Sequence, residues 1–201
     1  MIRTRILMTL IIVVTSLFMT SNVYASYDRI NATIYADAWA LGRNSNYPTN
    51  WNSDCADFVS QCLHEGGGLP FDDIHGWYIY KNLTGFYWGN AWSVAKDLMS
   101  WLLYYEGDNY QGATYIGNWG PDYQPDSNSL IQFGDVLIYD WGTGEGWSHA
   151  AIVADYGQDP NSPYYGNLQD QHTTDRKWAI WHLKAYNKNW RTTTIAVIRP
   201  N

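Results

Sequence analysis

The first half of the chain has two stretches in which apolar residues recur at helical spacing. The first runs from Tyr27 to Leu41 and is followed by Gly42, a residue type at which helices commonly end. The second runs from about Asp54 to Glu65 and leads into Gly66-Gly67-Gly68. The spacing predicts two helices, the first with this apolar stripe: Ile30, Ile34, Ala38 and Leu41.

A third helix and two loops are predicted in the middle of the chain. Asn90 can cap a helix that continues to Tyr105 and is closed by Gly107. From Gly107 to Ser129 the chain is rich in Gly, Pro, Asn and Asp, which indicates a long loop. An aromatic loop is expected before the third helix. Its rings, with Trp92 of the third helix, could line a groove for sugar or peptide, although most aromatic residues build a core: Trp77, Tyr78, Tyr80, Phe86, Tyr87, Trp88 and Trp92.

The last third of the chain is typical of strands. Short apolar runs separated by turn residues predict four strands, at 135–139, 149–154, 164–171 and 194–198. The stretch from Trp178 to Leu183 is ambiguous and favours a strand over a helix. Helices followed by strands, without a repeat or a linker, indicate one α+β domain.

The N-terminus has the layout of a secretory signal peptide. Arg3 and Arg5 precede an apolar run from Ile6 to Met19, and Val23-Tyr24-Ala25 fits a cleavage site. The run is shorter than the ~20 apolar residues that a membrane-spanning helix needs. We therefore expect residues 1–25 to be removed and residues 26–201 to form an exported protein, extracellular or associated with the cell wall, with no membrane segment.

Charge and cysteine content narrow the function classes. Removal of the two N-terminal arginines takes the formal net charge from −7 to −9, which disfavours nucleic acid as a partner. Two cysteines are too few for a disulfide scaffold. Cys55 and Cys62 would lie about 10 Å apart along one helix, beyond the ~7 Å that a disulfide allows. Both are expected to be free thiols, and no metal site or other cofactor is predicted. Oligomeric state is left open.

Cys55 lies where a helix is predicted to begin. The unpaired N–H groups and the dipole of a helix N-terminus favour a thiolate, which is the reactive form of cysteine. Asp54 can cap this helix, and Asp57 is placed like the acid of a capping box. Cys62 is expected to pack in the core.

A catalytic thiol needs a base, and five histidines are available: His64, His75, His149, His172 and His182. His64 lies two turns beyond Cys55, and His75 lies in a Gly-rich loop. His149 opens an apolar strand after a Gly-rich turn, so its ring could face a cleft at the edge of a sheet. The alternative is that His149 only caps its strand.

Long motifs make the chain similar to a known family. They are Asp54 to Leu63 with Gly66-Gly67, Phe133 to Val136, and Ser148 to Val153, with further matches upstream and at Gln171-His172-Thr173. Together they resemble the secreted putative-amidase domain family, which is grouped with papain-like NlpC-type and CHAP cell-wall cysteine hydrolases. This chain departs from the family pattern at Ala56-Asp57, where Thr-Asn is usual.

The resemblance implies a papain-like α+β fold in which N-terminal helices, one with the catalytic cysteine at its start, pack on an antiparallel sheet. It implies Cys55 as nucleophile and His149 as general base. A third residue on the next strand would orient the imidazole, with His172 preferred and Asp170 and Asn167 as alternatives.

The resemblance also places a tyrosine before the cysteine. Tyr47 occupies that place, and its hydroxyl could stabilise the oxyanion together with the backbone N–H of Cys55. The alternative is that Tyr47 packs beside Pro48. From the aromatic pattern, Trp77 is expected on a substrate wall.

These inferences predict a secreted cysteine amidohydrolase or peptidase that acts on peptidoglycan peptides through a Cys55 thioester. Two alternatives stay open: a non-catalytic wall- or glycan-binding protein on the same fold, and a secreted toxin that deamidates or acylates a protein partner. A binding module has no need of a thiol at a helix start, which favours the enzyme.

Overall fold

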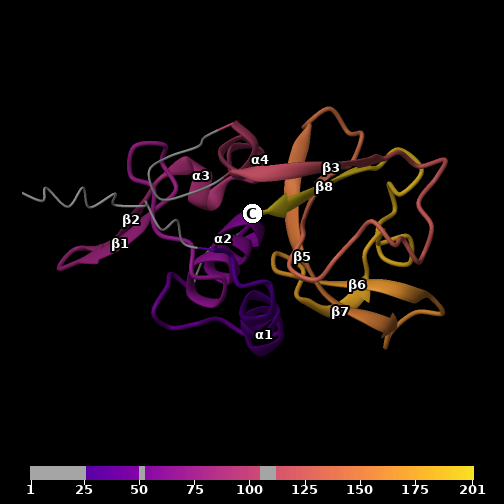
Figure 1. Cartoon of the computed structure of the whole chain (residues 1–201), viewed down its shortest axis with the longest axis horizontal. Coiled ribbons are helices and arrows are strands. Elements are labelled where there is room, and N and C mark those ends of the chain that lie inside the picture. The colour runs from indigo at the N-terminus through magenta and orange to yellow at the C-terminus, as the bar shows by residue number, and fades with distance from the viewer. Residues whose placement is uncertain (1–25, 50–52, 105–111) are drawn as a thin grey trace, which may run out of the picture.

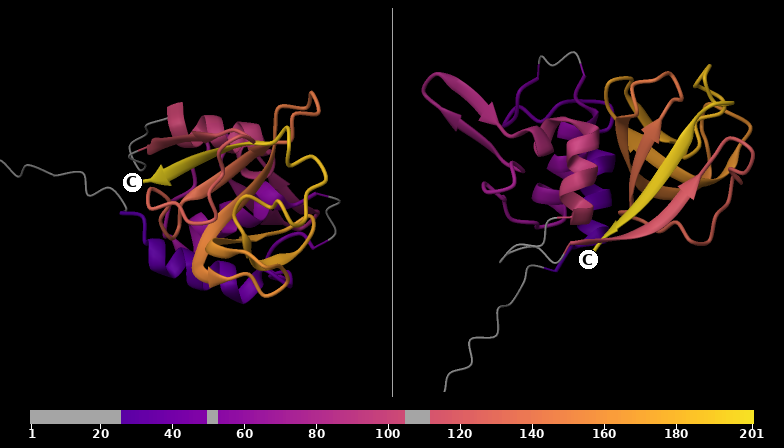
Figure 2. Two further views of the ribbon diagram at one scale, coloured as in Figure 1. Left: turned by 90° about the vertical axis from the view of Figure 1, so that its right-hand side faces the viewer. Right: turned by 90° about the horizontal axis from the view of Figure 1, so that it is seen from above.

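The computed structural model describes residues 26–49, 53–104 and 112–201, so the predicted signal segment lies outside the described residues. A group of helices packs against one side of a curved six-stranded sheet, and a small hairpin projects from the helical side (Figures 1 and 2). The helices are α1 Arg29–Trp39, α2 Cys55–Gln61, the π-helix η1 Cys62–Gly66, α3 Asn90–Ser93 and α4 Ala95–Tyr104. The protein is therefore α+β, as predicted.

The large sheet is antiparallel throughout, with strand order β3-β8-β4-β5-β6-β7. Its strands are β3 Ala113–Trp119, β4 Val136–Asp140, β5 Trp147–Gln158, β6 Tyr165–Gln171, β7 Arg176–Ile180 and β8 Thr194–Pro200. The projecting hairpin consists of β1 Ile79–Asn82 and β2 Gly85–Trp88. Among the described residues, no helix is long and apolar enough to cross a bilayer.

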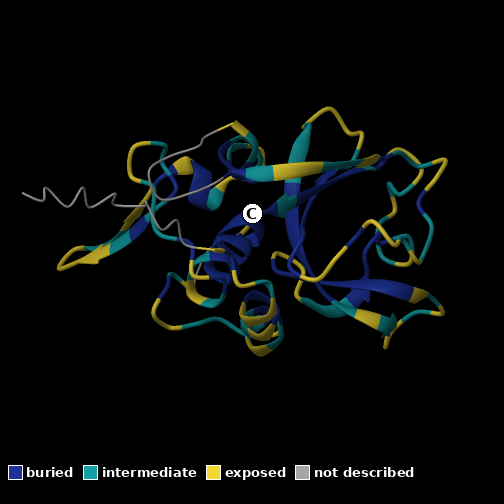
Figure 3. Cartoon of the chain, in the orientation of Figure 1, coloured by how far each residue is buried: buried dark blue, intermediate teal, exposed yellow. Residues whose placement is uncertain are grey.

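Both faces of the central strands are buried (Figure 3). In β4, for example, Val136 and Ile138 pack in the core under the helices, whereas Leu137 and Tyr139 pack in a second core on the opposite face. Side chains alternate between the faces of a strand, so two buried faces produce an uninterrupted apolar run. This explains why these strands could be recognised in the sequence.

The first helix forms where predicted, but it buries a different face. Ile30 and Ile34 of the expected stripe are each 59% exposed. The buried face consists instead of Ala32, Thr33 and Ala36, with Ala40 just beyond the helix. Small residues allow the backbone of α1 to approach η1 closely: a Cβ at Gly66 would lie 2.5 Å from the carbonyl oxygen of Asn31. Close backbone packing therefore outweighed the larger apolar side chains.

Three other predictions needed correction. The third helix is divided at Val94, which is extended (φ −120°, ψ 120°), and its predicted end lies outside the described residues. Part of the expected aromatic loop forms the hairpin β1–β2. Part of the expected 107–129 loop forms β3, whose irregular sequence is tolerated because it is an edge strand that pairs with β8 and has a bulge between Tyr115 and Gly117. The ambiguous 178–183 stretch is the end of β7 followed by a turn.

Candidate active site

Cys55 is the first residue of α2, the most deeply enclosed helix of the molecule. The side chain of Asp54, the residue before it, makes no capping hydrogen bond to this helix. Asp57 does not complete a capping box either, because its carboxylate accepts hydrogen bonds from Trp92 and Gln61. Neither carboxylate therefore caps the N–H groups of the first turn, and these N–H groups favour a thiolate beside them.

His149 enters the sheet at the start of β5 and hydrogen-bonds the Cys55 thiol. Burial alone raises the pKa of the Cys55 thiol, but the charge and hydrogen bond of His149 oppose it. Hydrogen bonds from the backbone of Ala150 and the hydroxyl of Thr173 act in the same direction, so the pKa of Cys55 is lowered from its ordinary value. The two residues that the sequence paired are in contact.

Gln171 at the end of β6 holds the other side of the imidazole. Its Oε1 lies 3.2 Å from Nε2 of His149. The amide orientation is set by two further bonds: Gln171 Nε2 donates to the carbonyl oxygen of Thr174 (2.8 Å), and Gln169 Nε2 donates to Gln171 Oε1 (3.0 Å). Because Oε1 is an acceptor, His149 must donate from Nε2, which leaves Nδ1 free to take a proton from Cys55.

The expectation that His172 orients His149 is wrong. Nδ1 of His172 bonds Asp54 Oδ2 (3.0 Å) and its Nε2 donates to the carbonyl oxygen of Trp39 (2.9 Å). The ring stacks on Phe58 of α2, with centroids 4.0 Å apart. Successive residues of a strand point to opposite faces, so His172 faces the helices while Gln171 faces His149.

The two alternatives for the third residue also lie elsewhere. Asp170 accepts a hydrogen bond from the backbone N–H of Trp178 (2.7 Å), and Asn167 bonds the backbone of Asn128 and Ile131. Neither contacts His149 through a hydrogen bond. The signal for Gln171 was present in the matched Gln171-His172-Thr173 motif, but it could not be chosen without the register of the sheet.

Thr173 follows β6 in an unusual backbone conformation. Its φ of 76° is rare for a β-branched residue. Asp54 holds it in place reciprocally: the Asp54 N–H donates to Thr173 Oγ1 (3.2 Å), and the Thr173 N–H donates to Asp54 Oδ1 (3.0 Å). Since Oγ1 already accepts from Asp54, its own hydrogen is available for the sulfur of Cys55. The strained turn therefore points a hydroxyl donor at the thiol.

Arg43 and His172 stabilise this turn through Asp54. Arg43 pairs with Asp54 and makes two bonds to the exposed Asp175, at 2.8 and 3.0 Å. The hydrogen bond and charge of His172 and the charge of Arg43 outweigh the burial of Asp54, so the pKa of Asp54 is lowered. The residue expected as a helix cap is instead the centre of an ionic network behind the thiol.

Tyr47 and Trp77 are not at the site. The Tyr47 hydroxyl donates to Glu65 Oε1 (2.6 Å), and the buried ring stacks on Trp92. Glu65 lies ten residues beyond Cys55, about 15 Å along a helix, so this hydroxyl cannot serve an oxyanion at Cys55. Trp77 is completely buried against Trp101, with ring centroids 4.1 Å apart, so it packs in the core rather than on a substrate wall.

A cavity of about 280 Å³ opens on the His149 side of the site. Its walls come from the segment before α2, the two ends of the β4–β5 turn, the β6–β7 turn and the loop before β8: Ser53, Trp141, Ser148, His149, Gln171, Thr173, Thr174, Arg176, Leu183, Tyr186 and Asn187. His149 and Gln171 are thus accessible to a ligand from this side.

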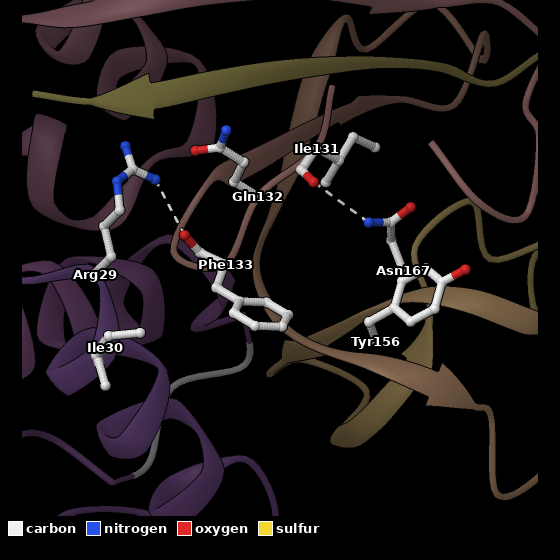
Figure 4. Close-up of a pocket in the computed structure, with 7 residues that line it drawn as sticks. All are labelled: Arg29, Ile30, Ile131, Gln132, Phe133, Tyr156 and Asn167. Carbon is white, nitrogen blue, oxygen red and sulfur yellow. Dashed lines mark hydrogen bonds between the residues drawn. The ribbon is translucent and has the colours of Figure 1, made fainter. Parts of the chain in front are cut away.

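A larger cavity of about 410 Å³ lies elsewhere, between α1 and the loop before β4 (Figure 4). It is mostly apolar, and its one charged residue, Arg29, is held by the carbonyl oxygen of Phe133 and by Asp135, both at 3.0 Å. Cys55, His149 and His172 do not line it; Asn167, one of the alternatives for the third residue, does. Within the described residues, no three His, Cys, Asp or Glu side chains are grouped as metal ligands.

The protein thus has an α+β fold with a site in which a thiol, an imidazole and an amide lie side by side. The chain belongs to the putative amidase domain family, whose model matches residues 26–195.

Two uncharacterized proteins of Bacillus subtilis (strain 168) are similar in sequence to this chain. YhbB is 27% identical over 169 residues, and YjcM is 28% identical over 144 residues. The alignments cover 82% and 68% of this chain but only 48% and 30% of those proteins. The chain thus spans about half of one relative and under a third of the other. No solved structure matches significantly.

Proposed function

We propose that the protein is a secreted cysteine amidohydrolase or peptidase that cleaves amide bonds in peptidoglycan peptides. The observation that carries the proposal is the hydrogen-bonded series Cys55, His149 and Gln171 beside an open cavity. A nucleophile, a base and a residue that orients the base are the minimum that acyl transfer by a thiol requires.

The reaction follows from the donor and acceptor roles. Nδ1 of His149 removes the thiol proton, and the sulfur of Cys55 attacks the carbonyl carbon of the substrate amide. The imidazolium then gives its proton to the departing nitrogen as the C–N bond breaks, leaving a thioester on Cys55. Water, deprotonated by His149, attacks the thioester and releases the acid and the thiol.

The oxyanion of each tetrahedral intermediate needs hydrogen-bond donors. The backbone N–H of Cys55, at the first position of α2, is one such donor. The hydroxyl of Thr173 donates a hydrogen bond to the thiolate before the attack. Tyr47, which the sequence suggested, takes no part because Glu65 holds its hydroxyl.

Export and substrate rest on the sequence. Arg3, Arg5, the apolar run and Val23-x-Ala25 support removal of a signal peptide. The similarity of the motifs to cell-wall hydrolases supports peptidoglycan peptides as substrate. One alternative is a toxin that deamidates or acylates a protein partner by the same acyl-enzyme chemistry. The other is a protein that binds the cell wall without catalysis.

Digestion of purified peptidoglycan followed by mass spectrometry tests the proposal. The secreted protein should release fragments with one new amine and one new carboxylic acid, and Cys55→Ala should release none. Cys62→Ala is the matched control, because Cys62 is equally unpaired but lies in the core. Full activity of Cys55→Ala would contradict the cysteine mechanism. Binding without cleavage by the parent would favour the binding module, and cleavage of protein alone would favour the toxin.

A further inference from the structure

The lining of the cavity beside His149 carries a positive charge, although the protein as a whole is acidic. The sequence contains 19 acidic and 12 basic residues. The residues that line this cavity nevertheless include no Asp or Glu, and Arg176 is the one Lys or Arg among them. A guanidinium in a site without carboxylates is the complement of a negatively charged group.

The position of Arg176 follows from the sheet. Arg176 begins β7, and its Cα pairs with that of Gln171 on β6. Cross-strand partners project from the same face of a sheet. The guanidinium therefore lies on the neighbouring strand from the amide that orients His149, and both side chains line the cavity.

Arg176 is held in place without being neutralised. Its guanidinium carbon lies 4.2 Å from the ring centroid of Tyr186, and the Tyr186 hydroxyl donates to both carboxylate oxygens of Asp159, at 2.6 and 2.8 Å. Stacking covers one flat face of a guanidinium and leaves its in-plane N–H groups free to bind a carboxylate.

Two acidic residues have other partners: Asp175, next to Arg176 in the sequence, and Asp159, which lies behind Tyr186. Asp175 is bound by Arg43 through two hydrogen bonds, and Asp159 accepts from Tyr186 and from the backbone N–H of Ile180. Within the described part of the chain, the side chain of Arg176 forms no ion pair or hydrogen bond. Folding has thus left a fixed guanidinium unpaired in the cleft.

Ser148 provides a second unsatisfied group in the same cavity. Its Oγ is buried and has no hydrogen-bond partner in the described structure, and it immediately precedes His149. Buried hydroxyls are normally hydrogen-bonded. A polar substrate atom in this cavity would satisfy it.

We propose that Arg176 is the specificity residue of the site and binds a carboxylate of the substrate close to the scissile amide, with Ser148 as a neighbouring hydrogen-bond partner. This rests on the proposed amide hydrolysis and narrows its substrate class to acidic peptides. A free carboxylate gains a charge-assisted, two-pronged hydrogen bond that a carboxamide cannot reproduce.

Matched substrates test the proposal. Soluble stem peptides released from peptidoglycan are used as prepared, or after their carboxylates are converted to carboxamides with carbodiimide and ammonia. The wild-type protein should prefer the free acids in kcat/KM by about tenfold or more, the size of a hydrogen bond to a charged group. Arg176→Gln should bring this preference close to one, and Arg176→Lys should keep part of it.

The matched control is Arg191→Gln. Arg191 also stacks on an aromatic ring, 4.2 Å from the centroid of Trp190, but it is exposed and outside the cavity. It should keep the wild-type preference. An unchanged preference in Arg176→Gln would overturn the role of Arg176.

Binding separates this proposal from the proposed hydrolysis. Cys55→Ala protein is titrated with the two peptide pools by calorimetry, with and without Arg176→Gln. If the wild type cleaves neither pool but acid-selective binding disappears with Arg176→Gln, hydrolysis fails and the carboxylate site stands. If cleavage occurs but both pools bind and react equally, hydrolysis stands and the carboxylate site fails.

Discussion

Oε1 of Gln171 accepts a hydrogen bond from Nε2 of His149 over 3.2 Å, and this single contact determines which nitrogen of the imidazole serves the thiol. The contact is itself fixed by Gln169 and by the carbonyl oxygen of Thr174, which hold the amide of Gln171 in one orientation. A neutral amide rather than a carboxylate therefore orients the imidazole here.

Removing the amide of Gln171 should weaken catalysis without abolishing it. Gln171→Ala frees the imidazole to adopt the other tautomer, and we expect kcat to fall about 10- to 100-fold, less than the loss of a general base. Steady-state kinetics on peptidoglycan peptides measure this effect. Gln158→Ala, at the far end of β5, is the control and should be near wild type. Wild-type kcat in Gln171→Ala would contradict the orienting role.

Loss of the nucleophile or the base should be non-additive. Cys55→Ala and His149→Ala should each remove amide hydrolysis while circular dichroism stays native-like. Because the two residues act as one unit, the double variant should be scarcely slower than either single variant. Additive losses would show that the two residues act in separate steps.

The two cysteines should differ in reactivity. His149 and Thr173 lower the pKa of Cys55, whereas burial raises the pKa of Cys62 well above its ordinary value. Iodoacetamide should therefore label Cys55 first, with an apparent pKa below the usual ~8.5, and His149→Ala should raise that pKa. Peptide mapping after timed alkylation measures both rates. Faster labelling of Cys62 would contradict this environment.

Substitutions of Thr173 should change the pKa of the Cys55 thiol and the stability of the fold independently. Thr173→Gly relieves a strained backbone worth about 1–2 kcal/mol but removes the hydroxyl beside Cys55. Loss of the Oγ1 that accepts from the Asp54 N–H offsets this gain, so we expect thermal stability close to wild type together with a higher thiol pKa. Thr173→Ser keeps the hydroxyl and should keep the thiol pKa close to wild type. If the glycine and serine variants had the same alkylation profile, the hydroxyl would have no effect on the thiol.

Asp57 should make stability depend on pH. Burial raises the pKa of Asp57 to about 7, although hydrogen bonds from Trp92 and Gln61 oppose the shift. The unfolded pKa is about 3.9, so the folded state holds an extra proton between these values. The contribution of Asp57 to the free energy of unfolding is complete below pH ~4 and is lost as the pH rises through ~7. The total loss is at most about 4 kcal/mol.

Asp57→Asn should flatten this part of the profile in urea unfolding measured from pH 4 to 8. Asp170, whose pKa is raised to about 8 by burial and the nearby Asp37, should leave a residual slope in the same direction. A profile for Asp57→Asn as steep as that of the wild type would show that Asp57 does not titrate in this range.

Local sequence determined much of this protein. Apolar runs in β4, β5 and β8 could be recognised because both faces of these strands are buried, and Gly66-Gly67 marked the end of the second helix. Cys55 and His149 were identified together because the chemistry of a thiol at a helix start demands a base, and the motifs around them extend over many residues.

Only the tertiary structure decided which side chains face the site, because this depends on the pairing register of the strands and on the face from which each side chain projects. Gln171 and His172 are adjacent in sequence, yet strand alternation sends one to His149 and the other to Asp54. For Tyr47 the sequence left two roles open, an oxyanion donor or a ring packed beside Pro48, and the fold places its hydroxyl on Glu65. Composition cannot settle such choices, because a one-residue shift in strand pairing exchanges the two faces of a strand without changing its sequence.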